Sequence, residues 1–406
     1  MSRPCTATLR PVLRMTVAER RTRLGRRHRL AAERKADDPV RAAASVVGLH
    51  GTDAASVFLS AWARMEDGDV AAVERALYED RTLLRVLAMR RTMFVAPVDA
   101  AVCMLAACSL DIAAVERRRL LGMVEAAGLG DNDPEGWLAA SEAAALEALE
   151  HHGEATASEL AGDDPQLSAV LVLAAGKKYE ARQKVVSRVL TVLGAQGRAI
   201  RTSPRGSWTS TQFRWASFDR WQPLAAPLPA ADAARAELAR RWLEAFGPAP
   251  LEDLRWWTGW TLGATRRAVA SNETAEVDLD GRPGLVLADD LEPEPPVAPW
   301  AALLPALDAT TMGWKERSWY LGEHAPLLFD RNGNASPTVW WDGRIIGGWA
   351  QAADGEIRFR LLEDVGADGV AAIEARASEL TARVGAARLS PRARSRSPVE
   401  SGLLGA

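Results

Sequence analysis

The stretch RQKVVSRVLTVLGAQGRAIRTSPRGSWTSTQFRWA, residues 182–216, decides the fold that the sequence predicts. Its first half repeats apolar residues at helical spacing and ends at Gly197, a residue typical of the position after a helix. Its second half alternates on either side of Pro204, as a two-stranded hairpin does. A predicted helix at 134–151 and a short helix after Gly153 precede it. Three helices followed by a hairpin make the winged variant of helix-turn-helix, so we expect such a unit here.

The same order of elements recurs along the chain. Residues 232–271 predict three helices, and a hairpin around Asp280 follows them. GEATASEL (153–160) and GPAPLEDL (247–254) occupy the same place in the two blocks, which indicates internal repetition. The first part of the chain also predicts helices followed by a short pair of strands. Those helices span 17–30, 39–49, 54–65 and 69–79, and the strands span 83–89 and 92–96.

These blocks predict an α+β, mainly helical fold of tandem winged-helix units with a β-rich C-terminal element. The C-terminal element is indicated by TVWWDGRIIGGWAQ and GEIRFRLL, two apolar segments with Asp-Gly hairpin turns. The last residues carry Pro, Ser and Arg with little apolar content, which favours disorder. We expect a first winged-helix-like unit at 14–110, a second with a basic hairpin at 111–222, a third at 230–292, the β-rich element at 297–388, and a disordered tail at 389–406.

Composition places the chain among soluble globular proteins, because 48% of its 406 residues are apolar and 25% are charged. Its three cysteines form no Cys/His cluster with metal-ligand spacing, which favours a reducing cytoplasm and argues against a bound metal. The sequence shows no apolar run of roughly 18 residues and no secretory signal, so we expect no membrane span. It also shows no phosphate loop and no dinucleotide fingerprint, so we expect no cofactor.

The net charge of -3 conceals a strong asymmetry along the chain. Residues 14–35 hold nine Arg or Lys against two Glu, and residues 177–220 hold ten against two acids. Residues 273–296 hold eight acids against Arg282. Clustered positive charge beside aromatic and hydroxyl groups is typical of a protein that binds a polyanion, so the two basic segments predict a nucleic-acid surface.

In a winged helix the third helix enters the major groove and the hairpin lies on the DNA backbone. The middle unit suits this arrangement, because Arg and hydroxyl side chains are the usual phosphate contacts. The third unit does not, since its hairpin is acidic around Asp280; we expect its Trp256, Trp257 and Trp260 to pack against neighbouring elements. The candidate contacts of the middle unit are Lys184 and Arg188 on the helix and Arg198, Arg201, Arg205 and Arg214 on the hairpin.

The candidate catalytic residues lie in VVGLHGTDAAS, residues 46–56. A neutral His50 could orient a water molecule and accept its proton near working pH. Thr52 could hold the same water, and Asp53 could orient His50 or face a developing cation. The same residues also suit a structural role. Thr52 or Asp53 could cap the helix that follows, which contributes about 1 kcal/mol, while Gly51 allows the turn and His50 ends a helix.

Five motifs in order give the chain a resemblance to a known family. They are VVGLHGTDAASVFLSAWARM, MRRTMFVAP, AFGPAPLEDLRWWTGW, LLPALDATTMGWKER and TVWWDGRIIGGW. The chain resembles the winged-helix DNA-binding proteins of the AlkZ/YcaQ-like DNA glycosylase superfamily over about residues 14–390. The resemblance implies a C-shaped stack of three winged-helix units that encloses a basic DNA channel.

At the site itself the chain departs from the family pattern. The glycosylases carry Gln-x-Gln or Gln-x-Asp where this chain has His50-Gly51-Thr52. They tend to carry Arg-Gly-Thr-Leu-His where this chain has Arg-Arg-Thr-Met-Phe, which adds Arg90, Arg91 and Thr92 to the candidate DNA contacts.

Three functions stay open from the sequence. The first is a monofunctional DNA glycosylase that removes alkylated or crosslinked bases, with His50, Thr52 and Asp53 as the catalytic group. The second is a non-catalytic DNA-binding regulator or damage sensor, and the third a small-molecule-binding scaffold. For the first two we expect double-stranded DNA as the partner, a monomer, and a cytoplasmic, nucleoid-associated location.

Overall fold

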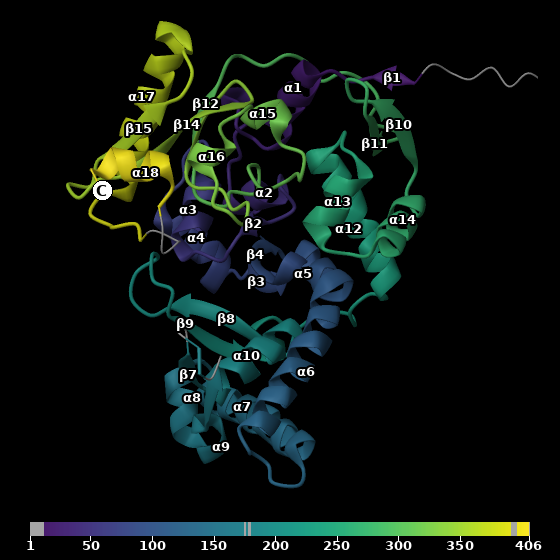
Figure 1. The fold of residues 1–406 in the computed structure, drawn as a ribbon, viewed down its shortest axis with the longest axis vertical. Helices are drawn as coiled ribbons and strands as arrows, with labels where there is room; N and C mark the ends of the chain where they lie inside the picture. The colour runs from purple at the N-terminus through teal and green to yellow at the C-terminus, as the bar shows by residue number, and fades with distance from the viewer. Residues whose placement is uncertain (1–11, 174–175, 178–179, 391–395, 406) are drawn as a thin grey trace, which may run out of the picture.

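Helices and one hairpin form the N-terminal part of the computed structural model, which describes residues 12–173, 176–177, 180–390 and 396–405 (Figure 1). The predicted pair of strands is confirmed, and these strands form a sheet in the order β2-β4-β3. The predicted helix at 39–49 ends at Ala44, because Leu49 and His50 pair with β4 instead. The elements are β1 (Leu13–Arg14), α1 (Val17–Arg27), η1 (Ala32–Arg34), α2 (Pro39–Ala44), β2 (Leu49–His50), α3 (Ala54–Trp62), α4 (Val70–Glu74), η2 (Arg75–Glu79), β3 (Leu83–Ala88), η3 (Met89–Arg91) and β4 (Thr92–Pro97).

One long helix, Val98–Ala126, links this part to the middle of the chain. It comprises α5 (Val98–Met104), the π-helical turn η4 (Leu105–Ser109) and α6 (Leu110–Ala126), so it runs through the unit boundary predicted after residue 110. By length and composition this helix is long and apolar enough to cross a membrane, with a mean hydropathy of 1.9 over its most apolar window, although Asp99 and Asp111 interrupt its apolar residues. Of the apolar window, 56% is buried inside the molecule, as in the core helix of a soluble protein.

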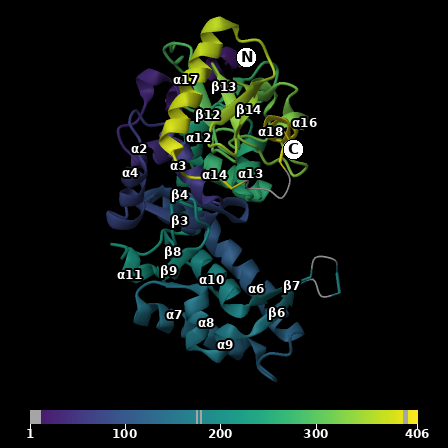
Figure 2. The same ribbon diagram turned by 90° about the vertical axis from the view of Figure 1, so that its left-hand side faces the viewer.

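The middle block contains the predicted helices and hairpin, and it lies below the rest of the molecule (Figure 2). Its hairpin pairs with β5, giving a sheet in the order β5-β9-β8. The excursion at 164–181, of which the structure describes only part, adds a short helix and a second hairpin. The elements are α7 (Pro134–His152), β5 (Ala155–Thr156), α8 (Ala157–Asp163), α9 (Pro165–Ser168), β6 (Val170–Leu173), β7 (Ala181–Lys184), α10 (Val185–Ala195), β8 (Ala199–Pro204), β9 (Phe213–Ser217) and α11 (Phe218–Trp221).

The third block repeats the local pairing of the middle block. Ala155 pairs with Trp215 of β9, and Ala249 forms an isolated bridge to Leu285 of β11. The similar segments around residues 153 and 247 therefore occupy equivalent places in the fold. Strand β1 adds to this hairpin in parallel, so the sheet order is β1-β10-β11. The elements are α12 (Ala231–Phe246), α13 (Leu251–Thr258), α14 (Leu262–Ala270), β10 (Thr274–Asp278) and β11 (Pro283–Leu287).

The C-terminal element is a four-stranded sheet in the order β12-β13-β14-β15, covered by α17. The predicted disordered tail is wrong where the structure describes it after residue 395, because residues 398–404 form a helix with a capping box between Ser397 and Glu400. Val399 of this helix is 1% exposed, and α18 packs on β14. Residues 391–395 and 406 of that prediction lie outside the described residues. The elements are β12 (Ala301–Leu304), α15 (Ser318–Leu321), α16 (Ala325–Leu328), β13 (Thr338–Trp341), β14 (Arg344–Gln351), β15 (Ile357–Leu361), α17 (Gly366–Val384) and α18 (Pro398–Leu404).

The basic run at 14–35 and the acidic run at 273–296 form ion pairs with each other. Arg23 and Arg27 of α1 form ion pairs with Asp290 at 2.9 and 2.6 Å. Arg26 and Arg27 pair with Glu294 at 2.9 and 3.0 Å. The prediction that residues 14–35 present a polyanion-binding surface is therefore wrong for Arg23, Arg26 and Arg27, because their guanidinium groups form ion pairs within the molecule.

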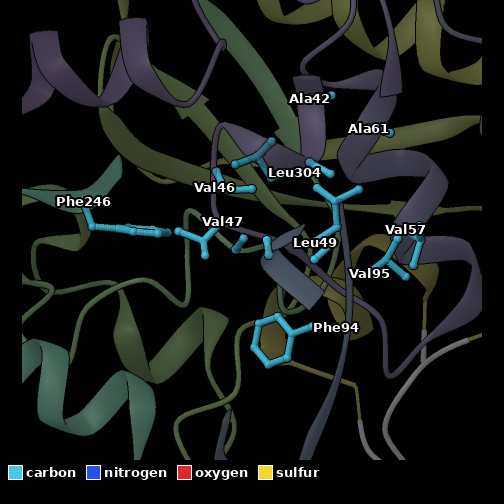
Figure 3. Packing of buried hydrophobic residues seen from close by; sticks show 14 of the residues in the cluster. Ala42, Val46, Val47, Leu49, Val57, Ala61, Phe94, Val95, Phe246 and Leu304 are labelled. Carbon is cyan, nitrogen blue, oxygen red and sulfur yellow. The ribbon is translucent and has the colours of Figure 1, made fainter. Parts of the chain in front are cut away.

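Strand β2 runs into the main hydrophobic core, so the segment that carries the candidate catalytic residues starts from a fixed position. Leu49 is fully buried among residues of α2, α3 and β4, and Figure 3 shows it beside Val57 and Val95. Phe94, which pairs with His50, lies on the other side of β2 from Leu49 (Figure 3).

Candidate active site and nucleic-acid interface

The loop between β2 and α3 is held by hydrogen bonds from two strands. The Gly51 backbone N–H donates to the Met93 carbonyl at 2.7 Å, and Arg85 Nη1 of β3 donates to the Gly51 carbonyl at 3.0 Å. A Cβ atom at residue 51 would meet Arg85 Nη1 at 3.2 Å and Val95 at 3.3 Å. Glycine is therefore favoured here by close packing, and the loop has a defined shape.

The three candidate catalytic residues differ in their exposure. His50 is only 4% exposed, and its ring centre lies 5.6 Å from that of Phe94. Thr52 is exposed at the surface of the loop. Asp53 caps α3, since its carboxylate accepts hydrogen bonds from the Ser56 backbone N–H and hydroxyl, both at 2.8 Å. Asp53 therefore has the structural role of a helix cap, and Thr52 is accessible to solvent, as a catalytic role requires.

A large cavity among the described residues lies directly beside this cap. Its volume is about 680 Å³, and Asp53, Ser56 and Leu59 line one side. Cavities that hold small molecules have volumes of ~300–1,000 Å³, so a nucleobase-sized group fits this one. The opposite walls come from the segments 329–337, 349–351, 389–390 and 396–404, which bring the C-terminal element and the described part of the tail to the site.

Arg90, Arg91 and Thr92 form the turn between β3 and β4, next to β2. Arg90 and Arg91 both adopt a left-handed backbone, with φ of 54° and 60°. Arg91 pairs with Glu116 at 3.1 Å, and the Thr92 hydroxyl donates to the Met89 carbonyl at 2.8 Å. The side chains of Arg91 and Thr92 thus have partners within the protein, while strand pairing brings the turn close to the candidate catalytic loop.

Arg90 stacks on Trp256, a contact that the sequence did not reveal. The Arg90 guanidinium carbon lies 4.0 Å from the ring centre, and Arg317 lies 5.0 Å from the same ring. Burial, reinforced by the nearby charge of Arg317, lowers the pKa of Arg90 to about 10. The predicted packing role of the tryptophans is supported, because Trp257 is 3% exposed and Trp260 donates to the Ala107 carbonyl at 3.2 Å.

The third helix of the middle block is largely enclosed by neighbouring elements. No residue of α10 is exposed, because α6, α7, α8 and β8 surround it. Arg188 donates to Gln183 at 2.9 Å and lies against Glu116 and Arg119 of α6. Lys184 is exposed, but it ends strand β7 and precedes the helix rather than lying on it. The prediction that Lys184 lies on the third helix is therefore wrong, whereas Arg188 does lie on it and is half-buried.

The hairpin of the middle block docks onto the first block. Trp208 at its tip is 8% exposed, and its ring lies 5.2 Å from Phe58 and 5.3 Å from Trp62 of α3. Arg201 stacks on Trp215 at 5.1 Å and is half-buried. The hairpin therefore contacts the same helix that Asp53 caps.

The other hairpin arginines keep more contact with solvent. Arg198 and Arg205 are exposed and form no ion pair within the part of the chain that the structure describes. Arg214 is half-buried and lies 3.8 Å from Glu159. Arg198 and Arg205 thus remain the accessible cations of the predicted basic hairpin.

A buried ion pair fixes the LLPALDATTMGWKER segment to α3. Arg64 and Asp308 have fully buried side chains and pair at 2.7 Å, and Ser60 and Thr310 complete the hydrogen bonds around them. Burial alone would raise the pKa of Asp308, but Arg64 and these hydrogen bonds hold it below its ordinary value. His28 accepts from Thr310 or donates to it at 2.8 Å, and burial lowers the pKa of His28 to about 3. This motif therefore fixes the position of α3, the helix that Asp53 caps.

Arg85 is the residue at the site that the sequence analysis missed. The available signal was its position, a single cation inside the apolar strand LLRVLAM. Within the described ranges no group of three or more His, Cys, Asp or Glu side chains could hold a metal ion. Cys103 and Cys108 are buried, and burial raises their pKa values to about 11 and about 12, so both thiols stay protonated at neutral pH.

Comparison with known proteins identifies the family. Residues 43–383 match the model of the family described as DNA glycosylase AlkZ-like. The interstrand DNA cross-link repair glycosylase of Streptomyces sahachiroi is 28% identical over 173 residues, which cover 40% of this chain and 46% of that protein. The matched region thus spans about half the length of that relative. The structure of Streptomyces sahachiroi DNA glycosylase AlkZ superposes with a TM-score of 0.69 at 21% identity, covering 94% of this chain and all of that one. The chain belongs to the AlkZ-like DNA glycosylase family.

Proposed function

We propose that the protein is a DNA repair glycosylase that hydrolyses the N-glycosidic bond of alkylated or crosslinked bases. The observation that carries this proposal is the loop at residues 50–53, which ends in Asp53 at the wall of the 680 Å³ cavity. This loop occupies the position where the glycosylases of the family carry their catalytic glutamine. Family membership supports the same reaction class.

The reaction makes few demands on the protein. Alkylation at N7 leaves a purine cationic and ready to depart, so the site must position a water molecule and stabilise positive charge on the sugar. We assign the water to Thr52, which is exposed, and the electrostatic role to Asp53, whose carboxylate borders the cavity. His50, which is 4% exposed at the start of this loop, would accept the proton of that water.

We further propose that the three helix-and-hairpin blocks are winged-helix units acting on double-stranded DNA. The support is their shared order, in which a short strand or bridge pairs with the last strand of each hairpin. The exposed Arg198 and Arg205 would contact phosphates, which position a protein on DNA without reading its sequence. We expect a monomeric intracellular protein that associates with the nucleoid.

The test uses duplexes that carry N7-alkylguanine or an interstrand crosslink, followed by alkaline cleavage of abasic sites. Wild type should release base, and His50→Ala should reduce the rate by ~10²–10⁴-fold, the usual contribution of general base catalysis. His50→Gln should keep more activity than His50→Ala, because an amide can still orient water. No product from the wild type on any lesion contradicts the proposal.

Asp53→Asn is the matched control for the carboxylate. Asparagine caps a helix as well as aspartate does, so α3 should stay intact while the negative charge is lost. A slower reaction with an unchanged melting temperature supports the electrostatic role. An unchanged rate assigns Asp53 to capping alone.

A non-catalytic DNA-binding protein is the second candidate, and one observation favours it. His50 is 4% exposed and the Asp53 carboxylate already accepts two hydrogen bonds, so both side chains have structural roles. A protein of this kind would protect a specific DNA sequence from cleavage and release no base.

A further inference from the structure

A buried arginine and a half-buried one meet where the hairpin of the middle block docks onto the first block. Arg85 comes from β3 and is 3% exposed, and Arg201 comes from β8. Their guanidinium carbons lie 4.5 and 5.9 Å from the ring centre of Phe213. One aromatic side chain of β9 therefore holds two cations from different blocks.

Neither arginine has an acidic partner among the residues that the structure describes. Arg85 Nε and Nη2 and Arg201 Nε are buried nitrogen atoms without a hydrogen-bond acceptor. Burial, reinforced by the charge of Arg85, lowers the pKa of Arg201 to about 10. Buried cations of like charge destabilise a fold unless an anion compensates them, so this arrangement is costly for a purely structural role.

Among the described residues, one side-chain hydrogen bond of Arg85 connects this pair to the candidate catalytic loop. Arg85 Nη1 donates to the Gly51 carbonyl at 3.0 Å, between His50 and Thr52. An anion that binds the unused nitrogen atoms of Arg85 would thus lie at a fixed distance from the loop. Trp208, at the tip of the same hairpin, packs on α3 and holds the two blocks together.

We propose that Arg85 and Arg201 bind one phosphodiester group of the DNA substrate and set its position relative to residues 50–53. This inference rests on the proposed function, since it names how that site positions its substrate. The planar guanidinium fork matches two phosphate oxygens, which a lysine ammonium cannot do. Arg201 is half-buried and receives the phosphate from the surface side, while Arg85 links it to Gly51.

The salt dependence of binding to an undamaged duplex tests this site. Each neutralised phosphate contributes a slope of about -0.9 in a plot of log K against log salt concentration. Arg201→Met should reduce the magnitude of the slope by about 0.9, and the double variant with Arg85→Met should reduce it no further, because both arginines hold one phosphate. Arg358→Met is the control, since Arg358 is exposed on β15 among acidic residues and should leave the slope unchanged.

A second measurement separates lost binding from lost folding. Inorganic phosphate should raise the melting temperature of wild type and Arg358→Met by the same amount, and should raise that of Arg201→Met by less. Arg201→Lys should restore most of the salt slope but only part of the reaction rate, because it keeps the charge without the fork. Equal slopes for wild type and Arg201→Met overturn the site.

The outcome also distinguishes this inference from the proposed function. If wild type releases no base from any lesion but Arg201→Met still changes the salt slope, the glycosylase proposal fails and the phosphate site stands. If base release continues while all salt slopes are equal, the phosphate site fails alone.

Discussion

Arg64 and Arg85 are both buried, yet they lie in opposite electrostatic surroundings. Arg64 is fully buried and forms two hydrogen bonds to the carboxylate of Asp308, at 2.9 and 2.7 Å. Arg85 is 3% exposed, and among the described residues its guanidinium group donates to one backbone carbonyl only, with Arg201 as its charged neighbour. The comparison teaches that burial alone does not define the role of a cation. A neutralised arginine stabilises the fold, whereas an uncompensated one beside a functional loop has donors left for a ligand.

Removing the carboxylate of the Arg64 site should have the largest effect on stability. Asp308→Ala leaves Arg64 buried without its counter-charge, which costs ~3–5 kcal/mol in the free energy of unfolding. Urea denaturation measures this loss. The double variant Arg64→Met with Asp308→Leu should recover most of it, because a well-packed apolar pair removes both charges. A loss below about 1 kcal/mol for Asp308→Ala would remove the basis of the comparison.

Lys35 is intermediate between Arg64 and Arg85, because both positively and negatively charged side chains surround its ammonium group. Burial, with the charges of Arg376 and Arg64, lowers its pKa to about 7, although Glu379 acts in the opposite direction. Above pH 7 the folded state has released this proton while the unfolded state still holds it, so wild type should gain stability as pH rises from 7 to about 10.

The measurement is the melting temperature of wild type and Lys35→Met across this pH range. The difference between the two should change in favour of wild type as pH rises, since methionine cannot titrate. A difference that stays constant shows that the ammonium group remains protonated and solvated.

Removing the uncompensated cation should have the smallest effect. Arg85→Met takes away one hydrogen bond to Gly51 and relieves the repulsion with Arg201, so we expect the free energy of unfolding to change by less than about 1 kcal/mol. Urea denaturation of the protein without DNA provides the value. A loss as large as that of Asp308→Ala would assign Arg85 to the fold instead of to a ligand.

The sequence predicted local structure well and long-range charge pairing poorly. Amphipathic spacing and turn residues located the helix after Lys184 and the hairpin around Pro204, because both depend on neighbours in the chain. The same reasoning treated residues 14–35 as a DNA-binding surface, although Arg27 pairs with Asp290, 263 residues away. The sequence around Arg27 cannot indicate an ion-pair partner that is so far away in the chain.

For the candidate site too, the sequence predicted the local segment but not the parts that come from distant residues. The loop at His50 could be found from its residue types and from the family resemblance, but the cavity beside it could not. Its walls come from segments near residues 330, 350 and 400, which approach only after the whole chain has folded. Arg85 was missed because a cation in an apolar strand does not by itself indicate a binding role. Its proximity to Arg201, over the ring of Phe213, is known only from the folded structure.

The acidic partners of α1 are synthesised long after the helix itself. Arg23 leaves the ribosome 267 residues before Asp290, whose backbone carbonyl it contacts. At a translation rate of ~5–20 residues per second, that interval lasts about 13–50 s. Strand β1 likewise meets β10 only when residue 278 has been made. The first helix of the nascent chain therefore acquires its neutralising partners when about seven-tenths of the chain has been made, and the N-terminal block completes its packing late.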